Sequence, residues 1–424
     1  MNQLKKEITL LSGVGQLSTT LMGTGLFMIP AVAAGIAGNY TLWAWIALFI
    51  AICPIALTFA TLGKHYPSAG GTAYFVRQAF NSRMENAVAW LFVSIIPVGI
   101  PPAVKLASGF LQPLLPDAIN SPLFAQTFTL ALLLAVNLSG SKSSGRIQTV
   151  IAISIFALIG AFLWKGNIGW QDTQMPLMQS EQWLPISLAL GVMFWCFVGI
   201  EAFAHMGEEF KNPQRDFPIA ILVGCFVAGA TYFACTVVVL KYHAYGSESF
   251  DSGSIPWLSA HLFGPRLASV ISLIGFFACF ASINLYTQSL ARMVWAQARQ
   301  HRPNSPLATL SERGVPKRAT LLVFGVLLAS CWLGELTNME LPVFLTLANS
   351  VFVMIYLLAM LSATRLLHGK GKALAYIALL LCVLVFVCLG WAMLYALMIL
   401  LIFMQPWKRA STINRTLPTA DESH

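Results

Sequence analysis

Long apolar runs with few or no charged residues recur along the whole chain and alternate with short polar segments. A helix needs about 20 apolar residues to cross the hydrocarbon core of a bilayer, and most of these runs approach or exceed that length. Twelve such runs are found, at residues 11–36, 41–62, 87–112, 123–140, 147–165, 184–206, 217–240, 267–290, 319–334, 341–363, 373–388 and 390–405. The pattern predicts an all-α integral membrane protein with twelve transmembrane helices.

Composition narrows the classes of function. Of the 424 residues, 57% are hydrophobic and 10% are charged, whereas charged residues make up roughly a quarter of an ordinary soluble domain. This composition excludes a disordered chain and argues against a soluble enzyme. The formal net charge of +9 does not indicate a nucleic-acid partner, because the charges gather in short segments between apolar runs. The expected partner is the lipid bilayer.

The basic residues orient the predicted helices. Cytoplasmic loops of membrane proteins carry an excess of Lys and Arg. With twelve helices both termini lie on one side, and all but four of the 25 basic residues fall there. The exceptions are Lys165, Lys241 and Arg266 on the opposite side and Lys105 inside the third run. Both termini are therefore predicted to be cytoplasmic.

Two of the runs carry a predicted helix-breaking sequence near their middle, which we take as the main pointer to function. Run one contains Gly23-Thr24-Gly25, and run six contains Gly199. A helix broken inside the membrane frees backbone N–H and C=O groups, which are tolerated around a polar cavity and can bind a small zwitterion. Because the breaks lie five runs apart, repeats of five helices would be inverted relative to each other, as in secondary transporters. The alternative for each glycine is close helix packing.

Charged side chains inside the runs are a second pointer. A carboxylate or ammonium at mid-membrane costs on the order of 3 kcal/mol, so Glu201 and Lys105 are candidates for proton coupling or gating. His205 lies one helical turn after Glu201 and shares its face. The alternatives are a Glu201 carboxylate held by free N–H groups of the break, and a His205 that only packs. Lys105 lies roughly 27 Å along its helix, where it can extend to the outer surface.

Four segments resemble the amino acid–polyamine–organocation transporter family. They are GTGLF at 23–27, YPSAGGTAYFV at 66–76, FWCFVGIEAFAHMGEEFKNPQRDFP at 194–218 and ARMVWAQAR at 291–299. The last departs from the family where an Asp-Gly pair usually follows, because Gln300-His301 stands there. The resemblance covers essentially the whole chain, and the 194–218 segment is its most specific piece.

The resemblance implies a LeuT-like fold, with a five-plus-five inverted repeat, broken helices 1 and 6, and two further helices at the C-terminus. The implied parts are a first repeat at 1–166, an inverted repeat at 167–364, helices 11 and 12 at 365–407, and a cytoplasmic tail at 408–424. Within the family, the chain is most similar to members that export L-methionine, leucine, isoleucine and valine across the bacterial inner membrane. Such export is proton-coupled and proceeds by alternating access, in a monomer or homodimer.

Residue roles follow from the same resemblance. Three residues of the first break would hold the substrate carboxylate, and the backbone of the second break would face its ammonium; these are Gly23, Thr24 and Gly25, and Phe197, Val198 and Gly199. Trp195 would be an aromatic lid over the substrate side chain. Glu201 would serve the inner gate and the response to protons. A lysine that replaces sodium in some members belongs to helix five, and the fifth run here has no lysine at its middle.

Other functions remain open at this stage. An uptake permease or an amino acid exchanger of the same fold is the first alternative, since the sequence does not set direction. A membrane-embedded enzyme would need a nucleophile with a base or a metal cluster, and the seven histidines are scattered. A nutrient sensor would need a cytoplasmic output domain. We expect no enzyme activity, no cofactor and no metal.

Overall fold

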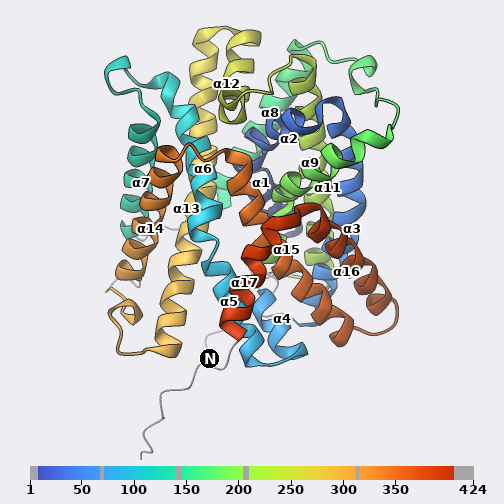
Figure 1. Ribbon diagram of the computed structural model, residues 1–424, viewed down its shortest axis with the longest axis vertical. Helices are drawn as coiled ribbons and strands as arrows, with labels where there is room; N and C mark the ends of the chain where they lie inside the picture. The colour runs from blue at the N-terminus through green and yellow to red at the C-terminus, as the bar shows by residue number, and fades with distance from the viewer. Residues whose placement is uncertain (1–7, 67–70, 140–144, 204–209, 312–314, 405–424) are drawn as a thin grey trace, which may run out of the picture.

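The computed structural model describes residues 8–66, 71–139, 145–203, 210–311 and 315–404, and every regular element in these ranges is helical (Figure 1). The α-helices are α1 (Leu10–Met22), α2 (Ile29–Ala37), α3 (Thr41–His65), α4 (Gly71–Ala79), α5 (Ser82–Val93), α6 (Ile96–Leu111), α7 (Pro122–Ser139), α8 (Gly145–Lys165), α9 (Trp183–Met193), α10 (Ile200–Phe203), α11 (Pro213–Lys241), α12 (Glu248–Phe263), α13 (Pro265–His301), α14 (Lys317–Leu336), α15 (Leu341–Leu366), α16 (Gly369–Leu389) and α17 (Met393–Met404).

Among the described residues, eight helical segments are long and apolar enough to cross a membrane: Ile29–His65, Ser82–Leu114, Pro122–Ser139, Pro213–Lys241, Pro265–Arg299, Lys317–Leu336, Leu341–Leu366 and Gly369–Met404. Eight is fewer than the twelve predicted helices for three reasons. The last segment joins runs eleven and twelve, and the second half of run one is joined to run two in Ile29–His65. Run six is broken into pieces too short to qualify, and run five contributes only a shorter apolar helix, Ile153–Lys165. The count of twelve stays a prediction.

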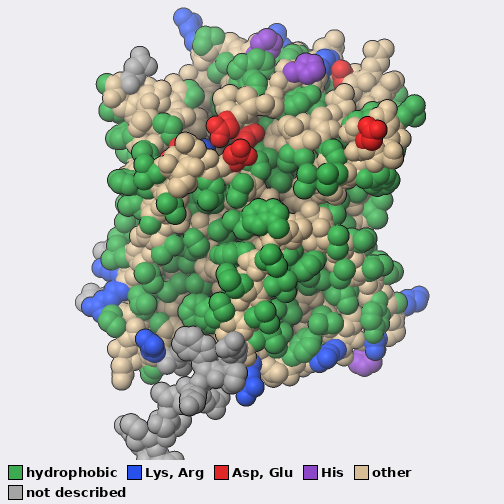
Figure 2. Space-filling view, in the orientation of Figure 1, with side chains coloured by type: hydrophobic (Ala, Val, Ile, Leu, Met, Phe, Trp, Pro, Cys, Tyr) green, Lys and Arg blue, Asp and Glu red, His purple; other side chains and the backbone are tan. Residues whose placement is uncertain are grey.

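The surface matches a protein that lies in a bilayer. Figure 2 shows one face, where hydrophobic side chains form a broad middle band. Lys and Arg line its lower rim, and Asp, Glu and His gather toward its upper end. Large apolar side chains such as Phe226, Leu380 and Leu394 are largely exposed, which would be costly in water and is favourable against lipid.

Both predicted helix breaks are present. In run one, α1 ends at Met22, a short 3-10 turn covers Gly25–Phe27, and α2 begins at Ile29 with Pro30 in its first turn. Proline suits that position because it has no N–H to leave unpaired.

In run six, α9 runs into a 3-10 turn, η7 (Phe194–Phe197), and α10 starts only at Ile200. Between them Gly199 has φ +124°, a backbone conformation that glycine adopts without strain. A glycine is therefore needed where this helix changes direction.

Packing brings the two breaks together in the middle of the bundle. The 3-10 turn of run one, η1 (Gly25–Phe27), contacts η7 of run six. Helix α1 packs on α8 and α11, while α6 packs on both α13 and α15 around the same centre (Figure 1). Two segments more than 160 residues apart in the sequence thus share one site.

Candidate binding cavity

A cavity of about 490 Å³, counting its open mouth, lies where the two breaks meet α6, α13 and α15. Its lining is formed by Thr20, Leu21, Thr24, Gly25, Ile95, Gly99, Ile100, Ala103, Trp195, Val198, Ser282, Ile283, Tyr286 and Phe352. The cavity is therefore built from five segments that are distant in the sequence.

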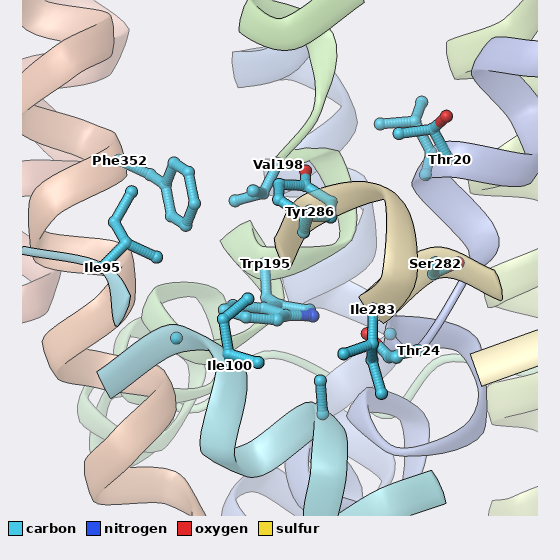
Figure 3. A pocket seen from close by; sticks show the side chains of 14 residues that line it. Thr20, Thr24, Ile95, Ile100, Trp195, Val198, Ser282, Ile283, Tyr286 and Phe352 are labelled. Atoms are coloured by element: carbon cyan, nitrogen blue, oxygen red, sulfur yellow. The ribbon is translucent and has the colours of Figure 1, made fainter. Parts of the chain in front are cut away.

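Most of the lining is apolar, and no charged side chain belongs to it within the described part of the chain. Figure 3 shows the Trp195 indole in the middle of the cavity, with Ile95 and Phe352 on one side and Thr24 and Ile283 on the other. The Trp195 and Phe352 rings meet edge to face, with centroids 6.2 Å apart. Such walls fit an uncharged, aliphatic or thioether group.

A few polar groups face this apolar space. The Tyr286 hydroxyl, on α13, is buried and has no hydrogen-bond partner in the described structure. Its ring stands beside Val198 in the cavity (Figure 3). A buried hydroxyl without a partner is costly unless a ligand or water completes its hydrogen bond. Tyr286 therefore marks a polar contact point that the sequence reading missed, because a lone tyrosine in an apolar run carries no motif.

At the first break, two of the three predicted residues line the cavity, namely Thr24 and Gly25. Close packing explains both glycines. A Cβ atom at Gly23 would lie 2.4 Å from the Ser282 hydroxyl oxygen, and one at Gly25 would lie 2.2 Å from that of Tyr232. The packing alternative is thus supported for both positions, and Gly23 lies outside the lining of the cavity.

At the second break, Trp195 and Val198 line the cavity, whereas Phe197 and Gly199 do not. The carbonyl of Phe197 accepts a hydrogen bond of 2.8 Å from the Tyr356 hydroxyl on α15. Gly199 approaches the first break closely, since a Cβ atom there would lie 2.9 Å from Thr20 Cγ2. The peptide groups of this break are present at the site, and two of their carbonyls already have partners, since that of Gly199 accepts from the Phe203 N–H at 2.9 Å.

Glu201 is completely buried two residues after Gly199, in the first turn of α10. Its Oε2 accepts hydrogen bonds from the Gly199 N–H at 2.8 Å and from the Tyr356 hydroxyl at 2.5 Å. Its Oε1 has no hydrogen-bond partner in the described structure. The carboxyl group is thus held by an N–H of the break, which was the structural alternative for this residue. His205 lies outside the described residues.

Lys105 lies away from the cavity, on α6, and forms an ion pair of 3.4 Å with Oε1 of Glu335. Gln126 Nε2 also donates to this oxygen, at 2.8 Å. Lys105 therefore does not simply extend into solvent. Its partner was not visible in the sequence, because Glu335 belongs to α14.

Asp251 on the short helix α12 also lies near Lys105, and its pKa is raised to about 6. Burial is the main cause, the charges of Glu248 and Glu340 add to it, and the charge of Lys105 opposes it. Several carboxylates and one ammonium thus gather at this end of the molecule, as the upper part of Figure 2 also shows. In the described residues, no group of three His, Cys, Asp or Glu side chains could hold a metal ion.

Comparison with known proteins adds one family match and three similar proteins. The family model described as amino acid permease matches residues 8–418. The chain is 47% identical over 400 residues to the L-methionine/branched-chain amino acid exporter YjeH of Escherichia coli, covering 94% of this chain and 96% of that protein. It is also 25% identical to the amino acid permease YecA of Bacillus subtilis, over 93% of each chain, and 23% identical to the putrescine transporter PotE of Haemophilus influenzae, over 85% and 86%.

Proposed function

Because the chain belongs to the amino acid permease family, and is thus a multi-pass membrane transporter of amino acids, we propose that it exports L-methionine, leucine, isoleucine and valine. The observation that carries this proposal is the cavity, whose described lining is apolar and without charge. A neutral aliphatic or thioether side chain gains from such walls, whereas a cationic side chain would be left there without a counter-charge. The 47% identical relative is an exporter of the same substrates.

In the proposed complex, the two breaks hold the ends of the amino acid that are common to all these substrates. N–H groups of the Gly23-Thr24-Gly25 break take the carboxylate, as N–H groups at helix ends commonly do; that of Gly23 also donates to the Thr19 carbonyl, at 3.0 Å. Carbonyls at 197–199 take the ammonium through acceptor capacity that their hydrogen bonds within the protein leave. The Tyr286 hydroxyl completes the polar contacts, and Trp195 covers the side chain. Recognition would then rest on backbone groups for the common part and on apolar walls for the variable part.

The finer architecture belongs to the same proposal. We place twelve helices in the bacterial inner membrane with both termini cytoplasmic, helices 1–5 at 1–166 and their inverted repeat at 167–364. Helices 11 and 12 follow at 365–407, before the tail at 408–424. The repeats rock about the central cavity, which opens to one side of the membrane at a time. The protein acts as a monomer or homodimer.

Protons are the proposed coupling ions, and Glu201 is the proposed carrier. It is a carboxyl group inside the bundle, directly after the break, and groups of this kind form the proton relays of many pumps and transporters. Lys105 and His205 were the other candidates. Lys105 is paired with Glu335 at a distance from the cavity, so its part would be in outer gating.

The test uses purified protein in liposomes with an imposed pH gradient. Labelled L-methionine, leucine, isoleucine and valine should each move against their own gradient when protons flow the opposite way. Lysine and putrescine serve as controls and should not move. Counterflow assays, with sodium and pH varied separately, distinguish proton from sodium coupling and export from plain exchange. Transport of lysine but none of the four neutral amino acids would refute the proposal.

A further inference from the structure

One hydroxyl group connects the buried carboxyl group to the backbone of the second break. The Tyr356 oxygen lies 2.5 Å from Oε2 of Glu201 and 2.8 Å from the carbonyl oxygen of Phe197. Tyr356 is fully buried on α15. The carbonyl of Phe197 stands at the end of η7, before the chain turns at Val198 and Gly199. It therefore lacks the continuous helix that would supply its usual partner.

The Tyr356 hydroxyl group has a single hydrogen and two possible acceptors. Whether Glu201 is ionised or protonated therefore decides to which acceptor Tyr356 donates. An ionised carboxylate only accepts, and a charge-assisted hydrogen bond is about twice as strong as a neutral one. The Tyr356 hydrogen then points to Glu201, and the Phe197 carbonyl is left free. A protonated Glu201 donates its own hydrogen to the Tyr356 oxygen. The Tyr356 hydrogen then returns to the Phe197 carbonyl.

We propose that Tyr356 is a positioning residue that transmits the protonation state of Glu201 to the Phe197 carbonyl, where it competes with the substrate ammonium. This inference rests on the proposed function, because it takes that carbonyl as part of the ammonium site. The peptide that carries it joins Phe197 to Val198, and Val198 lines the cavity. Loss of the proton from Glu201 thus opens an acceptor for the substrate, and return of the proton closes it.

The sign of this coupling suits exchange of an amino acid for a proton. A substrate ammonium at the Phe197 carbonyl and a proton on Glu201 exclude each other, so each is carried while the other is absent. The proton itself stays on Glu201 in the closed form and leaves from Glu201 in the open form, and Tyr356 remains neutral in both. No net charge is moved onto the tyrosine or onto the backbone.

Protonation of Glu201 itself, and not of a charged neighbour, controls the hydrogen bond of Tyr356. Tyr286 on α13 and Tyr356 on α15 are the titratable groups that face it, and both are tyrosines. Helices α3 and α4 also pack on α10 and carry Lys64 and Arg77, but in the described structure neither forms an ion pair with Glu201. Arg77 pairs with Glu85 instead, at 3.6 Å.

The chain offers a matched control at the first break. The Tyr232 hydroxyl donates to the carbonyl of Leu21 at 2.9 Å, and Tyr232 is also fully buried. No carboxyl group shares that hydroxyl in the described structure. Tyr232→Phe and Tyr356→Phe therefore remove the same atom, each from a hydroxyl that caps a break carbonyl, and only Tyr356 is connected to Glu201.

The experiment measures L-methionine binding to purified protein from about pH 5 to about pH 8. For the unaltered protein we expect the dissociation constant to be about tenfold larger at the acid end, the equivalent of one hydrogen bond. Tyr356→Phe should bind equally at both ends, because nothing competes for the Phe197 carbonyl. Tyr232→Phe should keep the tenfold ratio, whatever its absolute affinity. Tyr356→Phe with the unaltered pH ratio would overturn the proposal.

A second measurement needs neither substrate nor the Tyr356 variant. Protein labelled with carbonyl-13C phenylalanine is titrated, and the infrared band of the labelled carbonyls is followed. A pH-dependent shift is expected in the unaltered protein and should vanish in Glu201→Gln. Its absence in the unaltered protein would overturn the relay even if Tyr356→Phe failed to fold. If the relay shift is seen but no neutral amino acid binds, the proposed function fails and the relay stands.

Discussion

Trp195 belongs to the second break, and its side chain contacts both the first break and the wall of the cavity. Its ring reaches the first break, since a Cβ atom at Gly25 would lie 3.1 Å from Trp195 Cδ1. It also meets Phe352 of α15 edge to face. An indole in this position buries a large apolar area and makes favourable contacts with the sulfur of a thioether. It can cover a methionine side chain better than any aliphatic residue could.

Trp195→Leu is expected to weaken L-methionine binding by about tenfold and L-leucine binding by less, because sulfur–aromatic contact contributes about 0.3–1.5 kcal/mol. Binding of both amino acids and the melting temperature of the variant should be measured together. A variant that is destabilised yet binds both amino acids normally would show that Trp195 only packs between helices.

Tyr286→Phe tests the unpartnered hydroxyl in the cavity. If the hydroxyl contacts the substrate, its loss should weaken binding of all four amino acids equally, by roughly fivefold to tenfold, since it touches their common part. Thermal stability without substrate should be unchanged or slightly higher, because a buried group without a partner in the described structure is removed. Equal affinity in the variant would place the substrate elsewhere.

At the scale of the elements, both broken helices depend on tyrosines from their neighbours. Inside a membrane each free carbonyl needs a partner from the protein. Helix α11 supplies Tyr232 to Leu21, and α15 supplies Tyr356 to Phe197. The breaks are thus stabilised by elements that lie far away in the sequence. These two helices thus connect the breaks to the rest of the bundle.

Helix α12 carries a pH-dependent contribution to stability. The pKa of Asp251 is raised to about 6, mainly by burial. Between the ordinary pKa of about 4 and that value, the folded protein binds more protons than the unfolded chain. The free energy of unfolding therefore falls as pH rises through this window. Above about pH 6, Asp251 is ionised in the folded protein, where burial makes its charge unfavourable.

Asp251→Asn should accordingly raise the melting temperature at about pH 7.5, by a few degrees, and change it little at about pH 4.5. The charge of Lys105 opposes the rise in the pKa of Asp251. A Lys105→Met variant should therefore lower the melting temperature at about pH 7.5, the opposite of Asp251→Asn. A melting temperature of Asp251→Asn that is lower at about pH 7.5 would show that its contact with Lys105 outweighs burial.

For the whole molecule, the orientation of the bundle is the property that every proposed step depends on. The predicted arrangement places residues 241–266 outside and 291–318 inside. Ser249 and Asn304 are exposed and lie in these two segments. A maleimide that cannot cross membranes should therefore label Ser249→Cys in intact cells and label Asn304→Cys only after permeabilisation. The unaltered chain, with its eight cysteines, gives the background. Labelling of Asn304→Cys in intact cells would reverse the orientation.

The sequence by itself determined the helical class, the membrane and the places where two helices break. These are set by local properties, namely the length of apolar runs and the glycines at positions 23, 25 and 199. It also indicated Trp195 and Glu201, because an isolated indole or carboxyl group stands out in an apolar run.

Only the tertiary structure decided which side chains meet. Tyr286, Tyr356 and Glu335 lie at positions that no local pattern marks. Their partners or neighbours, Val198, Glu201 and Lys105, are 88 or more residues away in the chain. The contact of each pair depends on how the helices pack, and packing in a membrane is decided by the shapes of whole helix faces. The positions of the breaks could therefore be predicted from the sequence, whereas the hydrogen bonds that stabilise them could not.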